Sequence, residues 1–138
     1  MRLRKDAKVQ RLARVPLFEH CSKRELGLIA SLADEVDLAE GKMLVREGAF
    51  GHEFFVLVEG AVEVRKGKRK VATLGAGEFF GEIALISKIL RTATVTTTEP
   101  VRALVITGRD FATLLETVPQ IQANVLKALA DRLAADSY

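Results

Sequence analysis

The spacing of apolar residues changes twice along the chain, and the first stretch has the spacing of helices. Residues 6–14 fit a short helix that ends before Pro16, because proline restricts the residue ahead of it. Ser22 followed three residues later by Glu25 is a capping box, which predicts the start of a second helix. The apolar face expected for this second helix comprises Leu26, Ile29, Ala30 and Leu32.

From Val36 onward, the pattern is that of short strands separated by closely spaced glycines. Apolar and polar residues alternate at 61–65 and again at 92–98, and a last strand is predicted at 101–106. Turns at such short intervals are typical of a β-sandwich or a small roll rather than of β–α–β units. The central part of the chain is therefore predicted to be mainly β.

Helical spacing returns after Gly108, and Pro119 is expected to break or restart the helix. No linker or internal repeat divides the chain, so we expect a single domain. It would consist of an N-terminal helical segment at 1–33, a β-roll at 34–107 and C-terminal helices at 108–138. The apolar faces of these last helices comprise Phe111, Leu114, Leu115, Val118, Ile121, Val125, Ala128, Leu129 and Leu133.

Composition narrows the class of protein. Of the 138 residues, 49% are hydrophobic, which argues against disorder and suits one packed domain. No apolar run approaches the roughly 20 residues that span a bilayer, and the charged residues 1–6 lead into no apolar signal segment. Cys21 is the one cysteine, so no intramolecular disulfide can form, and a reducing, cytoplasmic setting is expected.

The net charge is +3, and two clusters hold much of the positive charge. Basic residues crowd positions 2–14 against a single acidic residue, and they crowd again at 65–70. Such clusters suit contact with nucleic acid or a membrane surface, but they also suit a solvated helix face and a polar hairpin tip. We favour the second interpretation, because no aromatic residues suited to base stacking accompany either cluster.

One segment between the predicted strands has the chemistry of a site for an anion and a sugar. Residues 77–86 combine glycines, a carboxylate and a short apolar helical turn, and Arg91 follows ahead of a β-type stretch. Backbone N–H groups at the start of a helical turn attract an anion, and a nearby guanidinium can clamp its oxygens. A carboxylate beside them must accept hydrogen bonds from another group, such as a ribose hydroxyl. Phosphate and sugar together indicate a nucleotide.

The sequence GEFFGEIALISKILRTATV, residues 77–95, strongly resembles the phosphate-binding cassette of cyclic nucleotide-binding domains. The usual form in that family is F-G-E-x-A-L-x, a few variable residues, then P-R-x-A. The resemblance extends over nearly the whole chain, including 15–26 and 47–60. It implies an eight-stranded β-roll or jelly roll with helices at both ends and the cassette at 79–94. Leu90 departs from the family, which often has proline before the arginine.

The resemblance implies a role for each of the main cassette residues. Glu82 would bind the ribose 2′-hydroxyl, and Arg91 would bind the phosphate. Gly81 would let the backbone approach the ligand without a Cβ in the way. The N–H groups of Ile83 and Ala84 would donate hydrogen bonds to the cyclic phosphate.

The residues that would contact the base are less closely defined. In the family, a threonine at the position of Thr92 can bond a guanine in the syn conformation, but threonine also occurs in domains that respond to cAMP. Val64 and Ala72 are candidates for an apolar base pocket, and ordinary core is the equal alternative. In relatives a C-terminal helix swings over the base, and here Arg132 would supply a cation–π contact. Core rather than ligand contact is expected for Phe79, Phe80, Leu85 and Ile86.

The resemblance implies a non-catalytic regulatory module that binds a cyclic nucleotide, cAMP in preference to cGMP, and shifts its C-terminal helices. Leu85 and Ile86 would repack against Phe111 and Leu115 on binding, which would shift the terminal helix. No metal is expected, because a cupin-like enzyme needs clustered histidines, and the two histidines lie far apart in the sequence.

Two alternatives stay open. One is a ligand-independent, cupin-like β-roll that acts as a protein-interaction module, and the other is the sensor fragment of a larger channel or transcription regulator. DNA binding by this chain alone is not expected, because the sequence ends before a helix-turn-helix could follow the last helix. A downstream protein partner and self-association are left open.

Overall fold

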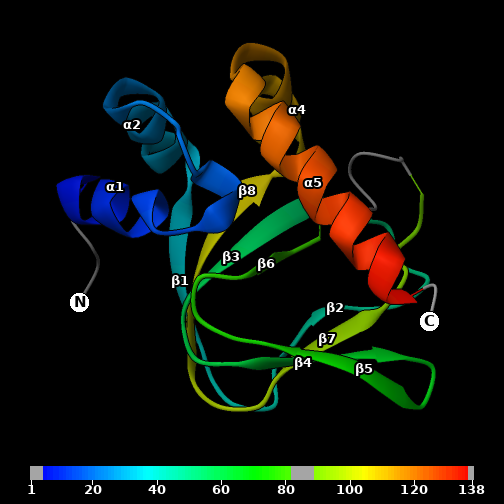
Figure 1. The fold of residues 1–138 in the computed structure, drawn as a ribbon. Helices are drawn as coiled ribbons and strands as arrows, with labels where there is room; N and C mark the ends of the chain where they lie inside the picture. Colours follow the sequence, from blue (N-terminus) through cyan, green and yellow to red (C-terminus); the bar gives the residue numbers. More distant parts are fainter. Residues whose placement is uncertain (1–4, 82–88, 137–138) are drawn as a thin grey trace.

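The computed structural model describes the backbone of residues 5–81 and 89–136 and the side chains of residues 6–81 and 89–132 (Figure 1). Three N-terminal helices precede the strands: α1 (Lys5–Ala13), the 3-10 helix η1 (Pro16–Phe18) and α2 (Lys23–Leu32). Two helices follow them: α4 (Gly108–Thr117) and α5 (Pro119–Asp136). The strands are β1 (Asp34–Leu38), β2 (Met43–Val45), β3 (Glu53–Glu59), β4 (Val62–Lys66), β5 (Arg69–Leu74), β6 (Phe79–Phe80), β7 (Thr94–Thr97) and β8 (Val101–Thr107).

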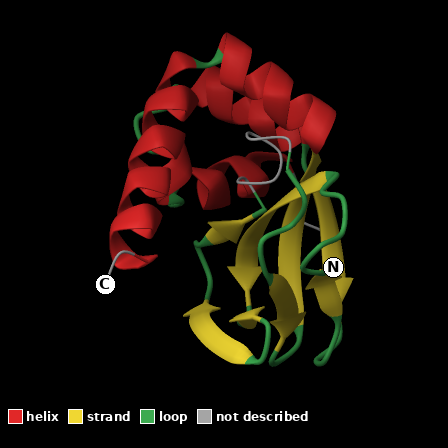
Figure 2. Cartoon of the chain, turned by 90° about the vertical axis from the view of Figure 1, so that its right-hand side faces the viewer, coloured by secondary structure: helices red, strands yellow, loops and turns green. Residues whose placement is uncertain are grey.

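These eight strands form two four-stranded antiparallel sheets, as the predicted β-roll requires. The first sheet has the order β1-β8-β3-β6, and the second has the order β2-β7-β4-β5. Helices from both ends of the chain gather on one side of the strands (Figures 1 and 2). The predicted order of helices, β-roll and helices is therefore confirmed.

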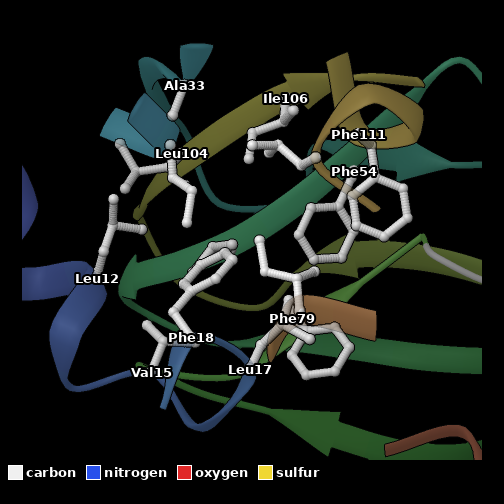
Figure 3. Close-up of a cluster of buried hydrophobic side chains, with 14 of the residues drawn as sticks. Leu12, Val15, Leu17, Phe18, Ala33, Phe54, Phe79, Leu104, Ile106 and Phe111 are labelled. Carbon is white, nitrogen blue, oxygen red and sulfur yellow. The ribbon is translucent and has the colours of Figure 1, made fainter. Parts of the chain in front are cut away.

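Two hydrophobic clusters lie on opposite faces of the first sheet. Alternate residues of β3, such as Phe54 and Val56, pack with the helices, and Figure 3 shows this cluster. The residues between them, Phe55 and Leu57, face the second cluster together with Val95 of β7. Because both faces are covered, five successive residues of β3 are buried, and this strand shows no polar alternation.

Local signals set the helix boundaries. The predicted capping box is present: the Ser22 hydroxyl accepts from the Glu25 N–H at 3.1 Å, and Glu25 accepts from the Ser22 N–H at 2.7 Å. Thr107 caps α4 by accepting from the N–H of Asp110. Pro119 is the first residue of α5, so the helix restarts at this proline, as expected. None of the helices in the described ranges has the length and apolarity needed to cross a bilayer.

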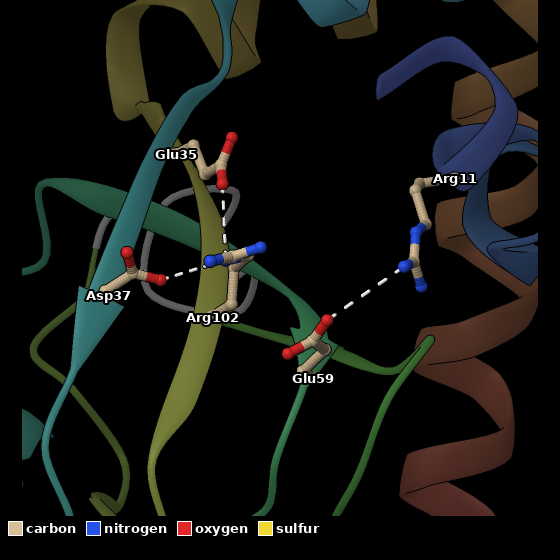
Figure 4. Close-up of polar contacts among 5 residues, drawn as sticks. All are labelled: Arg11, Glu35, Asp37, Glu59 and Arg102. Atoms are coloured by element: carbon tan, nitrogen blue, oxygen red, sulfur yellow. Dashed lines mark hydrogen bonds and ion pairs between the residues drawn. The ribbon is translucent and has the colours of Figure 1, made fainter. Parts of the chain in front are cut away.

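A charged group lies at the outer edge of the first sheet, where β1 pairs with β8 (Figure 4). Arg102 donates to Asp37 at 2.9 Å, and its Nε also lies 3.2 Å from the Glu35 carboxylate, which is 2% exposed. The hydrogen bond to Asp37 raises the pKa of Arg102. Arg11 of α1 lies 4.0 Å from Glu59 at the end of β3. The contacts of Arg102 thus join β8 to β1 by charge as well as by backbone hydrogen bonds, and the Arg11–Glu59 pair joins α1 to β3.

The two basic clusters of the sequence lie in different places. In α1, Lys8 donates to the carbonyl of Ala33 at 2.9 Å, so part of the first cluster makes an internal contact. The second cluster forms the exposed tip of the β4–β5 hairpin, where Arg65 donates to the Lys68 carbonyl. The hairpin expected around Gly67 is therefore present.

Candidate functional site

Arg91 is a buried arginine just ahead of β7, with a 7% exposed surface. Its Nη1 donates to the Gly81 carbonyl at 2.9 Å, and its Nη2 donates to the Glu53 carbonyl at 2.7 Å. One acceptor follows β6 and the other begins β3, so the guanidinium joins the two strands at the start of the cassette. Both of these acceptors are backbone carbonyl oxygens, and they orient the guanidinium.

The backbone of Arg91 is held as well. Its N–H donates to the Ala49 carbonyl at 2.8 Å, and its carbonyl accepts from the Gly48 N–H at 2.8 Å. The loop between β2 and β3 therefore fixes the main chain while β3 and Gly81 fix the side chain. An arginine held at both ends is preorganised, because little of its rotamer freedom is left to lose on binding.

Gly81 has a structural reason to be glycine. Its φ of +100° lies in the region that L side chains rarely adopt. A Cβ at this position would lie 2.9 Å from the Glu53 carbonyl oxygen and 3.0 Å from Arg91 Nη1. The space that the glycine keeps open is thus filled by the guanidinium and the β3 backbone. The predicted approach of a ligand to this backbone stays a prediction.

Three predicted ligand contacts, Glu82, Ile83 and Ala84, lie outside the described residues, and so do Leu85 and Ile86. Their proposed roles therefore stay predictions. The residues on both sides of the gap are placed: Gly81 before it and Arg91 after it are joined by the guanidinium bond. Two residues within the predicted cassette, ten positions apart in the sequence, are thus brought together.

Val64 and Ala72, the candidates for a base pocket, lie directly opposite each other on β4 and β5. Val64 also lies opposite Val95 of β7, because β4 is one of the two central strands of the second sheet. Both candidates are half-buried, and Val64 packs against the cluster between the sheets. Thr92 follows Arg91 directly and has an exposed surface. These placements are compatible with core and with a pocket wall alike.

Arg132 of α5 contacts β6 rather than pointing into solvent. Its guanidinium carbon lies 4.5 Å from the ring centroid of Phe79, and its Nη2 donates to the Phe79 carbonyl. Phe79 and Phe80 are both buried, as predicted for core residues. The predicted contact between Arg132 and a purine base stays a prediction.

Asn124 was not among the predicted functional residues, and it anchors α5. Its side-chain amide donates to the carbonyls of Leu17 at 2.8 Å and Glu19 at 2.9 Å, in and just after η1. A polar residue on the same face as Ile121 and Val125 was the signal in the sequence, because that face is otherwise apolar. The bond links the helices from the two ends of the chain.

Metal or nucleophilic chemistry finds little support among the placed residues. No cluster of three or more histidine, cysteine, aspartate or glutamate side chains suited to a metal occurs in the described part of the chain. His20 and His52 are both exposed. Cys21 is half-buried, and burial followed by the charge of Glu25 raises the pKa of its thiol, which disfavours the reactive thiolate.

Comparison with known proteins gives a consistent result. The model of a family described as "Cyclic nucleotide-binding domain" matches residues 35–118. A cAMP-dependent protein kinase regulatory subunit from Mycosarcoma maydis is 35% identical over 133 residues, which cover 90% of this chain and 25% of that protein. A putative potassium channel protein from Rhodopseudomonas palustris is 32% identical over 124 residues, covering 88% of this chain and 30% of the channel.

A solved structure agrees with these relatives. The catabolite activator protein of Thermus thermophilus superimposes with a TM-score of 0.81 at 28% identity, covering 88% of this chain and 60% of that one. This chain therefore spans about a quarter to a third of the two curated relatives and under two thirds of the solved structure.

Proposed function

Because this chain belongs to the cyclic nucleotide-binding domain family, we propose that it binds cAMP in preference to cGMP and moves its C-terminal helices in response. It acts as a non-catalytic regulatory module and needs no metal. A cytoplasmic setting, expected from its single cysteine, is part of the same proposal.

The buried guanidinium of Arg91 carries the proposal. Its bonds to Gly81 and Glu53 place a positive charge at the start of the cassette before any ligand arrives. Burial strengthens the attraction of that charge for a phosphate, because less water screens it. A planar guanidinium also matches two phosphate oxygens at once. In this arrangement Glu82 accepts from the ribose hydroxyl, and the N–H groups of Ile83 and Ala84 bind the phosphate.

The base is proposed to lie against Val64 and Ala72. Their pairing on neighbouring strands offers a continuous apolar patch, which suits the flat face of a purine. Thr92, next to the phosphate-binding arginine, would lie near the base, where its hydroxyl permits a bond to guanine without requiring it. The preference for cAMP rests on the name of one relative, which is the regulatory subunit of a cAMP-dependent protein kinase.

The response is proposed to run through α5. This helix reaches β6 through Arg132 and η1 through Asn124, so it touches both the cassette strand and the N-terminal helices. A ligand that binds one position of α5 better than another shifts the population of the two. The relatives are three to four times longer than the matched region, so the chain is proposed to regulate a larger assembly, of which a channel or a kinase is an example.

Calorimetric titration of the parent chain with cAMP and cGMP tests the proposal, together with the variant Arg91→Ala. Loss of a charge-assisted bond to the phosphate is worth about 1.5–3 kcal/mol, so affinity is expected to fall roughly tenfold to a hundredfold.

Arg102→Ala is the matched control. It also removes a hydrogen-bonded arginine, but that residue lies at the β1–β8 edge, away from the cassette. This variant is expected to lower the melting temperature and leave affinity unchanged. Unchanged affinity in Arg91→Ala would contradict the assignment of the phosphate site, and no heat from the parent chain with either ligand would contradict the function.

A further inference from the structure

Phe79 contacts the Arg132 guanidinium in two independent ways. The ring lies 4.5 Å from the guanidinium carbon, and the backbone carbonyl of the same residue accepts a hydrogen bond from Nη2. Phe79 is itself fixed, because it is 7% exposed and its ring packs on Phe54 with centroids 5.6 Å apart. A cation over an aromatic face favours arginine, whose flat guanidinium can stack, over lysine.

The position of β6 in the sheet explains why its carbonyl is available to Arg132. β6 is the edge strand next to β3. The Leu57 N–H donates to the Glu78 carbonyl at 2.8 Å, so that carbonyl faces β3. Carbonyls alternate along a strand, so the next one, that of Phe79, faces away from the sheet. A further strand would normally donate an N–H to this outward carbonyl, and here Arg132 of α5 is the donor.

The same short stretch supplies a carbonyl acceptor to each of the two guanidinium groups of the proposed site. Arg132 bonds to the carbonyl of Phe79, and Arg91 bonds to the carbonyl of Gly81 two residues later. At most about 7 Å of extended backbone separates the two acceptors. One guanidinium therefore lies at the proposed phosphate site, and the other lies close to it on the helix that would cover the base.

We propose that Phe79 is a positioning residue, which holds the Arg132 guanidinium in the orientation that stacks on the purine base of a bound cyclic nucleotide. This inference rests on the proposed function, in which α5 covers the base. A free arginine side chain loses much rotamer freedom when it is ordered against a ligand. The ring and carbonyl of Phe79 impose that order beforehand, so the ligand gains the contact at a smaller entropic cost.

The test compares Phe79→Leu with Phe80→Leu in the full chain by calorimetric titration. Both residues are buried in β6, but Phe80 stacks on Phe55 in the opposite cluster, so Phe80→Leu reproduces the lost aromatic packing at a residue that faces away from α5. Phe79→Leu is expected to weaken cAMP binding about fivefold, within the range of a cation–π contact. Phe80→Leu is expected to change it less than twofold, and Phe79→Tyr, which keeps the aromatic face, is expected to restore binding.

A smaller ligand separates positioning from general loss of structure. Ribose 3′,5′-cyclic phosphate without a base should bind Phe79→Leu and the parent chain equally, because it offers Arg132 no ring. A double-mutant cycle adds a second readout: once Arg132→Ala is present, Phe79→Leu should weaken cAMP binding no further.

Each other outcome is decisive. Equal effects of Phe79→Leu and Phe80→Leu, or additive losses in the cycle, would overturn the positioning role while leaving nucleotide binding intact. Unchanged cAMP affinity in Arg132→Ala would do the same. Absence of cAMP and cGMP binding by the parent chain would instead overturn the proposed function, and the inference with it.

Discussion

Replacing Gly81 with alanine tests whether the start of the cassette is built around Arg91. Two costs follow from the structure. Forcing an L residue to a φ of +100° costs about 1–2 kcal/mol. The new Cβ would also lie 2.9 Å from the Glu53 carbonyl oxygen and 3.0 Å from Arg91 Nη1, so the backbone or the guanidinium must move. Weakening a buried hydrogen bond to a charged group adds about 1–3 kcal/mol.

Gly77→Ala separates these two costs. Gly77 has a similar φ of +89°, but an added Cβ there would meet nothing within 4 Å. This control should therefore lose only the strain, about 1–2 kcal/mol, whereas Gly81→Ala should lose about 2–5 kcal/mol in total. At this chain length, each kcal/mol lowers the melting temperature by roughly 3 °C.

The two variants are compared by thermal unfolding and by titration with cAMP. Gly81→Ala should unfold at a lower temperature than Gly77→Ala and bind at least about tenfold more weakly, because the displaced guanidinium would no longer face the proposed phosphate site. Gly77→Ala should bind like the parent chain. Equal melting temperatures and equal affinities in the two variants would refute the reasoning, since strain alone would then account for the whole effect.

Three further predictions concern other parts of the chain. Thr92→Ala should lower affinity for cGMP more than for cAMP in parallel titrations, and equal losses would exclude a role in reading the base. Asn124→Ala removes the bonds to Leu17 and Glu19, so hydrogen exchange in α5 should accelerate and stability should fall by about 1–2 kcal/mol; unchanged exchange would show that apolar packing alone holds the helix. Burial raises the pKa of the Cys21 thiol, so the stability that this thiol contributes is complete below the ordinary thiol pKa and is lost as the pH rises past that value. In chemical denaturation at alkaline pH, Cys21→Ser should therefore show a flatter decline of stability than the parent chain. An identical decline in the two proteins would contradict this.

The helices and strands could be predicted because their signals are local. The capping box at Ser22, the proline at 119 and the alternation at 61–65 each act within a few residues, and the structure confirms the elements they predict. The cassette could be located by resemblance, because its glycine, carboxylate and arginine keep a fixed spacing. None of these signals depends on how distant segments meet.

The contacts around Arg91 could not be predicted, because they use backbone groups. The carbonyls of Ala49 and Glu53 accept from this arginine, yet any residue at those positions offers the same acceptor. The pairing of Arg132 with Phe79 spans 53 positions and depends on the docking of α5, which no local pattern reports. The role expected for Gly81, to let a ligand approach the backbone, stays a prediction. Its neighbours in space, Arg91 and β3, emerge only from the fold.

The division of the interior by β3 has a consequence for how the protein unfolds. Phe54 and Phe55 are adjacent in the sequence but belong to different clusters, one shared with the helices and one enclosed between the sheets. The helical layer can therefore open as a cooperative unit while the interior of the roll stays packed, at a free energy below that of global unfolding. Amide exchange should then fall into two classes, with the α5 amides faster than those of β3 and β8. Under the proposed function, the free energy of ligand binding would need to match only the first, smaller opening, and the strands would remain a fixed frame.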